Sequence, residues 1–231
     1  MHQSINKKKI YLYIFIFLFL STSYNLNLSK NFNQIGLIKS IDIIGLSKKE
    51  EILIKEELKT YLNSNVFLLN KDLILKSLNQ FNFLEKIIVK KIFPSKLEVN
   101  LKKTKFLGTT IIDGRKYYIG SNGMFTKSDQ INNENNLPLV FGNFQINDFL
   151  ELQNNLKKQN INLNQIDKYF FYKNKRWDLQ INGGLLLKLP SKDLNNSLKI
   201  YKKLIENNDL HSIKIIDLRM SNQIILTDEK K

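Results

Sequence analysis

The feature that most constrains this chain is an uninterrupted apolar run near its start, residues 10–20 (IYLYIFIFLFL), directly after Lys7, Lys8 and Lys9. Lysines that precede an apolar segment hold their own side of it in the cytoplasm, by the positive-inside rule. We therefore expect everything from about residue 29 onward to fold outside the cytoplasm. No later segment is apolar enough to suggest a second span.

On the residues alone, two fates of this segment stay open. Eleven apolar residues fit the core of a cleaved signal peptide, whereas a membrane-spanning helix needs about 20. Extending the run through Tyr24, Leu26 and Leu28 gives 19 residues, which suits a signal anchor over residues 10–28, and the sequence has no clear Ala-x-Ala cleavage site. Either fate carries the remainder of the chain across the membrane.

The composition excludes several kinds of site. The 231 residues include no cysteine and only two histidines, so disulfides, thiol catalysis and cysteine metal sites are excluded, and a histidine relay would rest on His211. The net charge of +15 comes from 33 Lys and 3 Arg, next to 30 Asn and no Ala. This usage is typical of an A+T-rich coding sequence and lacks the arginine-rich or aromatic signature of nucleic-acid binding. We expect no nucleic acid, cofactor, metal or small-molecule substrate.

The first exported stretch has the element order β-α-α-β-β. Ser47 and Glu50 form a Ser-x-x-Glu capping box before the first helix, and Asn70 is placed to cap the second. In the last strand, apolar residues alternate with polar ones, as in a strand with one buried face. The expected elements are a strand over 38–44, helices over 48–61 and 71–79, and strands over 87–93 and 96–102.

Residues 86–105 are the most basic part of this stretch, with seven Lys and one Glu. One interpretation is contact with acidic lipid headgroups or anionic cell-wall polymer. The other is a solvated strand face, because lysines alternate there with Leu97, Val99 and Leu101 and because lysines protect sheet edges from pairing. The alternation favours the solvated face.

From Phe106 the pattern changes to short strands separated by turns, with Asp113-Gly114 and Asn122-Gly123 as hairpin-type punctuation. The pattern predicts a mostly antiparallel sheet with helices, and thus an α+β fold overall. The expected elements are strands over 108–112, 116–119, 137–142, 169–172, 176–181 and 185–189, helices over 148–159 and 194–205, and final strands over 212–220 and 223–227. Ser191 is the expected cap of the second helix.

An anchor, a β-α-α-β-β unit and an antiparallel sheet domain in this order resemble the FtsQ/DivIB family of bacterial cell-division proteins, whose first exported module is a POTRA domain. Two positions depart from the family pattern. The acidic-x-x-Pro-x-Ala junction is here residues 101–107 (LKKTKFL), and the aromatic residue after Asp-Leu-Arg is here Met220. The stretches that carry the resemblance are 41–45 (IDIIG), 65–69 (NVFLL), 92–99 (IFPSKLEV), 111–113 (IID), 123–125 (GMF), 137–142 (LPLVFG), 176–179 (RWDL), 182–183 (NG) and 216–219 (IDLR).

The resemblance implies a short cytoplasmic tail over 1–9, a transmembrane signal anchor over 10–28, a POTRA domain over 29–103 and an FtsQ-type sheet domain over 104–231. It favours the anchor over the cleaved signal. It further implies a single-pass inner-membrane protein with a cytoplasmic N-terminus and a periplasmic bulk, found at the division septum. Such a protein catalyses nothing and links divisome proteins, chiefly FtsB and FtsL.

In the family, the last strands of the sheet domain receive the partner as an added strand, a mode in which backbone hydrogen bonds supply affinity. Arg219 is expected either to pair with a partner carboxylate or to form an ion pair within the chain, with Asp217 or with a neighbouring strand. Met220 suits core packing and interface contact equally, whereas Trp177 is expected to pack in the sheet. Carried onto this sequence, the partner-binding residues are Arg219, Met220, Ser221, Asn222, Gln223, Ile224 and Ile225, with Lys175 and Arg176 as a second candidate surface.

Two rival functions are an exported hydrolase and an exported binder of anionic cell-wall polymer. An exported hydrolase would need His211, Asp178 and Asp217, or a pair of carboxylates such as a glycosidase uses, yet nothing in the spacing or context singles out two carboxylates. An exported binder of anionic cell-wall polymer would use the lysines, and its binding would fall steeply with salt.

Overall fold

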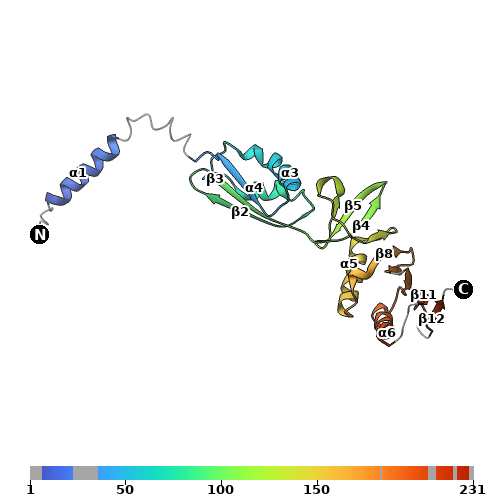
Figure 1. The fold of residues 1–231 in the computed structure, drawn as a ribbon. Helices are drawn as coiled ribbons and strands as arrows, with labels where there is room; N and C mark the ends of the chain where they lie inside the picture. Colours follow the sequence, from blue (N-terminus) through green and yellow to red (C-terminus); the bar gives the residue numbers. More distant parts are fainter. Residues whose placement is uncertain (1–6, 23–35, 183, 208–211, 221–222, 229–231) are drawn as a thin grey trace, which may run out of the picture.

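The computed structural model describes residues 7–22, 36–182, 184–207, 212–220 and 223–228. The apolar run forms one helix, α1 (Lys7–Thr22). A small α+β unit and a larger sheet unit follow (Figure 1). Within the described ranges, no helix combines the length and the apolarity that crossing a membrane requires. The predicted span over 10–28 includes residues 23–28, which lie outside the described residues.

The small unit has the predicted β-α-α-β-β order. Its sheet has the strand order β1-β3-β2, with β1 parallel and β2 antiparallel to the central β3. Both helices pack their apolar residues onto one face of this sheet. The elements are β1 (Ser40–Ile44), α3 (Lys48–Leu58), the 3-10 turn η1 (Lys59–Tyr61), α4 (Lys71–Leu78), β2 (Leu84–Ile92) and β3 (Lys96–Lys103).

Local side-chain bonds fix where these helices begin. The Ser47 backbone N–H donates to Glu50 Oε2 over 2.9 Å, and the Ser47 hydroxyl donates to the same oxygen over 2.6 Å. Asn70 Oδ1 accepts from the backbone N–H of Asp72 over 2.9 Å. Both predicted caps are therefore confirmed. The predicted helix over 48–61 differs only in its last turn, which tightens to the 3-10 form of η1.

The lysine-rich strands have the alternation expected of a sheet with one solvated face. Leu97, Val99 and Leu101 are buried against the helices, and the residues between them are more exposed. On the open face, lysines pair with carboxylates across neighbouring strands, which supports the solvated-face interpretation. The pairs are Lys90–Glu98, Lys96–Asp42 and Lys102–Glu85.

The larger unit is a nine-stranded sheet with the order β12-β11-β10-β9-β8-β7-β4-β5-β6. Five of its eight neighbouring pairs are antiparallel and three are parallel, so the prediction of a mostly antiparallel sheet is confirmed. The elements are β4 (Phe106–Ile112), β5 (Arg115–Gly120), β6 (Phe125–Lys127), η2 (Ser128–Gln130), β7 (Leu139–Phe141), α5 (Ile146–Lys158), η3 (Leu163–Gln165), β8 (Ile166–Phe171), β9 (Trp177–Ile181), β10 (Leu185–Lys188), α6 (Leu194–Asn207), β11 (Ile213–Asp217) and β12 (Ile225–Asp228).

The two helices of this unit account for two of its parallel pairs. A parallel pair needs a long crossover, and α5 connects β7 to β8 while α6 connects β10 to β11. Both helices pack on one face of the sheet, where Phe149 and Leu198 join Leu179, Leu187 and Ile216 in the core. The other face of the strands β7 to β12 is left without a covering helix among the described residues.

The final strands are shorter than predicted. β11 ends at Asp217 although the pattern predicted a strand to Met220. The cause is local: the Arg219 backbone N–H donates to Asp217 Oδ1 over 3.1 Å, a turn-forming bond that competes with strand pairing. α6 begins at Leu194, so Asp193 rather than Ser191 stands directly before it, and the prediction of Ser191 as the cap is wrong.

The two units share an apolar boundary. Phe106, Tyr118 and Ile131 lie beyond residue 104, yet they complete the core of the small unit. Along β5, Tyr118 packs into that core and the next residue, Ile119, packs into the core of the large sheet, because successive strand residues point to opposite faces. The domain division at 103/104 stays a prediction, and the small unit's core extends past it.

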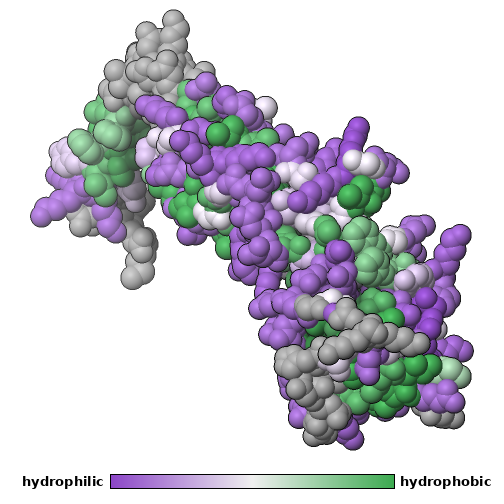
Figure 2. All heavy atoms as spheres, turned by 45° about the vertical axis from the view of Figure 1, so that its right-hand side comes forward, coloured by the Kyte–Doolittle hydropathy of each residue, from purple (hydrophilic) through white to green (hydrophobic). Residues whose placement is uncertain are grey.

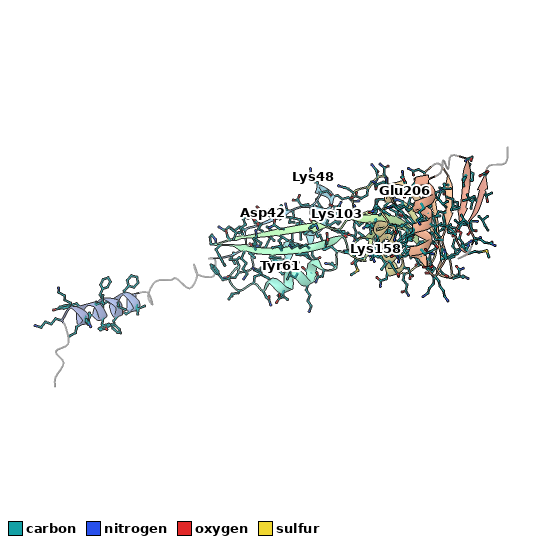
Figure 3. The ribbon with its side chains drawn as sticks, turned by 90° about the horizontal axis from the view of Figure 1, so that it is seen from below. Asp42, Lys48, Tyr61, Lys103, Lys158 and Glu206 are labelled. Carbon is teal, nitrogen blue, oxygen red and sulfur yellow. The ribbon has the colours of Figure 1, made fainter. Side chains whose placement is uncertain are left out.

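Polar bonds also cross this boundary. Lys103, labelled in Figure 3 where the two units meet, places its Nζ 3.0 Å from Glu50 Oε1 and 2.7 Å from Glu134 Oε1. Lys49 Nζ donates to the Ile131 carbonyl over 2.8 Å. The side-chain amide of Asn82 donates to the Phe125 carbonyl over 2.9 Å. The junction is thus held by both apolar contacts and hydrogen bonds.

Candidate partner-binding edge

β12 is the terminal strand of the nine-stranded sheet. It pairs antiparallel with β11, with Leu226 opposite Ile216 and Ile225 opposite Asp217. No described strand pairs with its outer side, so its outward N–H and C=O groups are available for hydrogen bonds. Ile224, Ile225 and Leu226 are 44–47% exposed, and Figure 2 shows apolar surface at the C-terminal end of the molecule. An exposed apolar edge of this kind can accept an added strand.

A row of side chains crosses the uncovered face of the sheet and ends at this edge. Residues that are directly opposite on paired strands point to the same face. The helix-facing row contains buried Leu179, Leu187 and Ile216, so the neighbouring row points away from the helices. From β8 to β12, that row is Phe170, Asp178, Lys188, Asp217 and Ile225. It places a lysine between two carboxylates next to the edge strand.

Asp217 is bound by Arg219 in this structure. The Arg219 Nε lies 2.8 Å from Asp217 Oδ1, and its Nη2 lies 2.5 Å from Oδ2. These bonds hold the pKa of the Asp217 carboxyl below its usual range, and the same bonds raise the pKa of Arg219. Of the two alternatives for Arg219, the intramolecular pair is therefore present, and contact with a partner carboxylate stays a prediction.

Asp178 is buried with a much weaker partner. Arg176 Nε lies 3.7 Å from Asp178 Oδ1, too far for a hydrogen bond, and neither atom has a hydrogen-bond partner among the described residues. The Arg176 guanidinium instead lies over the Tyr172 ring, 4.2 Å from its centroid. Burial raises the pKa of the Asp178 carboxyl, and the charge of Arg176, a side-chain hydrogen bond with Tyr172 and the charge of Lys188 oppose that rise only in part. The ionised form of Asp178 is incompletely compensated.

A cavity of about 760 Å³ lies at the end of the sheet where β10 and β11 finish. It brings Arg176 together with Arg219 and the start of β12, which lie more than 40 positions further along the sequence. The two candidate surfaces from the sequence thus meet, except that Lys175 is not in the lining. The lining residues from the predicted edge are Arg219, Met220, Gln223, Ile224 and Ile225. Predicted residues Ser221 and Asn222 lie outside the described residues.

Other candidate residues have clear positions. Trp177 is buried and contacts the rings of Phe144, Phe149 and Phe171, so its packing role is confirmed. Met220 is exposed and lines the cavity, which excludes core packing for it. Sequence reasoning missed the cavity wall formed by residues 190–193 and the first turn of α6. The only sequence feature that pointed to this wall was Pro190-Ser191, a break in the pattern before the predicted helix.

The hydrolase candidates do not assemble into a site in the described part of the chain. Asp178 and Asp217 lie on strands that are separated by β10, with Lys188 between them. His211 lies outside the described residues. Among the described residues, no group of three or more His, Asp or Glu side chains could hold a metal ion.

Two family models match the chain. Residues 37–103 match the model described as "POTRA domain, FtsQ-type". Residues 110–219 match the model described as "Cell division protein FtsQ/DivIB, C-terminal". The first match covers the three-stranded unit, and the second ends at Arg219, directly before the segment that leads to β12.

Curated proteins with related sequences share one name. The chain is 27% identical over 188 residues to "Cell division protein FtsQ" of Rickettsia bellii, covering 80% of this chain and 70% of that protein. It is 26% identical to the protein of that name from Bradyrhizobium diazoefficiens, covering 71% and 48% of the two chains. The one from Rhizobium meliloti is 21% identical, with 80% and 61% covered.

Proposed function

The chain belongs to the FtsQ/DivIB family of bacterial cell-division proteins, and we propose that it is a non-enzymatic divisome scaffold that captures FtsB or FtsL by strand addition at β12. The observation that carries the proposal is the exposed, apolar and outwardly unpaired edge of the nine-stranded sheet. An unpaired apolar edge strand promotes aggregation, because its free backbone groups can pair with another chain. A partner strand would cover it.

Strand addition explains both affinity and selectivity at this edge. Backbone hydrogen bonds to β12 provide affinity for any extended segment. Selectivity comes from the side chains of alternate residues, with Leu226 on the helix-facing side and Ile225 on the open side next to Asp217. A partner with apolar residues at alternate positions fits both sides.

Arg219 adds a charged contact to this apolar edge. Asp217 bonds two of its three guanidinium nitrogens, and within the described residues Nη1 has no hydrogen-bond partner. Arg219 and Arg176 both line the cavity, so a partner carboxylate bound there would meet two arginines.

The N-terminal helix supports a membrane anchor as part of this function. α1 has 16 residues, which corresponds to roughly 24 Å at about 1.5 Å per residue, against roughly 30 Å for the hydrocarbon core. We propose that the span continues through Leu28, as the apolar residues Tyr24 and Leu26 suggest. The tail over 1–9 is then cytoplasmic, the bulk is periplasmic, and the chain is a single-pass inner-membrane protein at the division septum.

The lysine-rich strands offer little support for the rival wall-polymer function. Four of their lysines pair with carboxylates of the same unit. A polyanion would have to displace these carboxylates before it gained the lysines. Strand addition at β12 does not involve these lysines, so it breaks none of these ion pairs.

The test is binding of the full chain, held in lipid nanodiscs, to the exported segments of FtsB and FtsL from the same organism. Ile224→Pro removes a backbone donor at the edge, whereas the matched Ile224→Ala variant keeps the donor and shortens the side chain. The proposal predicts micromolar or tighter binding by the wild type, near-wild-type binding by Ile224→Ala, and loss of binding by a folded Ile224→Pro. Equal binding by all three chains would move the interface away from β12.

A further inference from the structure

The small unit ends in an apolar tip that lies away from the partner-binding edge. The tip consists of Phe67 and Leu68 in the loop before α4, and Ile92 and Phe93 at the turn between β2 and β3. All four side chains are exposed, and Leu68 is the most exposed at 84%. The Phe67 and Phe93 rings stack with their centroids 4.9 Å apart and an interplanar angle of 17°. Exposed aromatic residues that stack on each other form a continuous apolar surface.

Side chains that bond the backbone of Phe67, and the packing of its ring, hold the tip in place. Phe67 N–H donates to Asn65 Oδ1 over 2.9 Å, and Lys91 Nζ donates to the Phe67 carbonyl over 3.2 Å. The Phe67 ring lies against Gly36, where a Cβ would come within 2.5 Å of the ring; the glycine also has a φ of +84°. These contacts fix the outward direction of the aromatic ring before any ligand is bound.

The tip lies where the chain enters the small unit. Val66 N–H donates to the Gly36 carbonyl over 2.6 Å, and Lys39 N–H donates to the Ser95 carbonyl at the β2–β3 turn over 2.8 Å. Figure 1 shows this turn at one end of the molecule's exported part and β12 at the other end. Residues 23–35 separate Thr22 from Gly36, and a chain of this length spans at most roughly 45–50 Å.

The charges around the tip match an anionic surface. Of the four lysines in residues 86–96, Lys90 and Lys96 are paired with Glu98 and Asp42, and Lys86 lies six positions before Ile92 on β2. Lys91 is therefore the lysine of this stretch that contacts the tip without a carboxylate partner among the described residues. Its Nζ bonds the carbonyl of Phe67, one of the two stacked aromatic residues. Apolar side chains at a bilayer interface, with lysines beside them at headgroup level, are the usual composition of a surface-inserting element.

We propose that the apolar tip inserts into the anionic membrane surface, and that it orients the exported part with β12 directed away from the bilayer. The proposal rests on the membrane anchor of the proposed function, because the tether to α1 is what keeps the tip near lipid. Three or four side chains are too few for a stable protein interface, which buries about 800 Å² on each partner. A tethered tip needs far less, since the anchor supplies a high effective concentration of lipid surface.

The experiment uses the full chain, whose lack of cysteine allows single labelling sites. Leu68→Cys carries a polarity-sensitive dye at the tip. Gln80→Cys is the matched control, because Gln80 is an exposed residue just beyond the opposite end of α4. Each labelled chain is reconstituted in phosphatidylethanolamine vesicles with roughly one quarter phosphatidylglycerol, and quenching by nitroxide-bearing lipids is measured.

The proposal predicts that nitroxide lipids quench the Leu68→Cys dye at least about three-fold more than the Gln80→Cys dye. Adding Phe93→Ser, which changes an exposed side chain, should reduce that quenching, and replacing phosphatidylglycerol by phosphatidylcholine should reduce it as well. Equal quenching at both positions in chains that float with the vesicles overturns the tip proposal and leaves the anchor intact. Shielding of the tip only after FtsB or FtsL segments are added also overturns it. Failure to float at all refutes the anchor itself.

Discussion

Lys103→Ala is the sharpest test of how the two units are joined. Glu50 is fully buried at the start of α3, and Lys103 Nζ is the only cation that the described residues place within ion-pair distance of it, at 3.0 Å. The same ammonium bonds Glu134 at 2.7 Å. Removing it leaves a buried carboxylate that keeps only the bonds from Ser47.

The expected cost follows from burial. Breaking a fully buried pair by removing one partner costs about 3–5 kcal/mol. Because the Lys103 side chain is 26% exposed and Ser47 still bonds the carboxylate, we expect a smaller loss, about 2–3 kcal/mol in the free energy of unfolding. The neighbouring Lys102 is 68% exposed in its pair with Glu85, so Lys102→Ala should cost less than about 0.5 kcal/mol.

The assay is urea unfolding of the full chain and of both variants, followed by tryptophan fluorescence and by circular dichroism. The single tryptophan, Trp177, lies in the core of the large sheet, so it reports that unit, whereas circular dichroism reports both. Glu50→Gln should also reduce the cost of Lys103→Ala, because the uncompensated charge is then gone. Equal stability of Lys103→Ala and Lys102→Ala would refute the reasoning.

Two further predictions concern the carboxylates near the edge. Asp217 has a lowered pKa because Arg219 bonds it, so its stabilising effect is present above the unfolded carboxyl pKa of about 3.9 and is lost as the pH falls through the lower folded value. Arg219→Gln should therefore lower the Tm at pH 7 by an amount that shrinks toward zero in strong acid; a constant difference would contradict this. Asp178 has a pKa raised by burial, so its charge opposes folding above that pKa and the penalty falls as the pH drops. Asp178→Asn should raise the Tm at pH 7 more than at pH 4, and a lower Tm at pH 7 would show that Arg176 compensates the charge fully.

Local signals in the sequence predicted much of the fold. Ser47 with Glu50, and Asn70, mark true helix starts because each side chain bonds a backbone group only two or three residues away. The alternation over 96–102 correctly placed Leu97, Val99 and Leu101 in a core, because one side of that strand is covered by helices. Such features depend on neighbours in the chain, and the sequence displays them directly.

What the sequence could not supply depends on distant contacts. Tyr118 and Ile119 are adjacent apolar residues in one strand, and only the assembled structure reveals that they belong to different cores. Arg176 and Arg219 lie 43 positions apart, and they meet at one cavity because α6 returns the chain parallel to β10.

The central claim, that β12 receives a partner strand, is tested most directly by hydrogen–deuterium exchange of the full chain in nanodiscs with and without the exported FtsB segment. Strand addition would protect outward backbone N–H groups of residues 223–228 that exchange quickly in the unbound chain. The account predicts slower exchange in this segment and an unchanged rate in residues 66–69 at the tip. Slower exchange confined to other strands, with residues 223–228 unaffected by a bound partner, would contradict it.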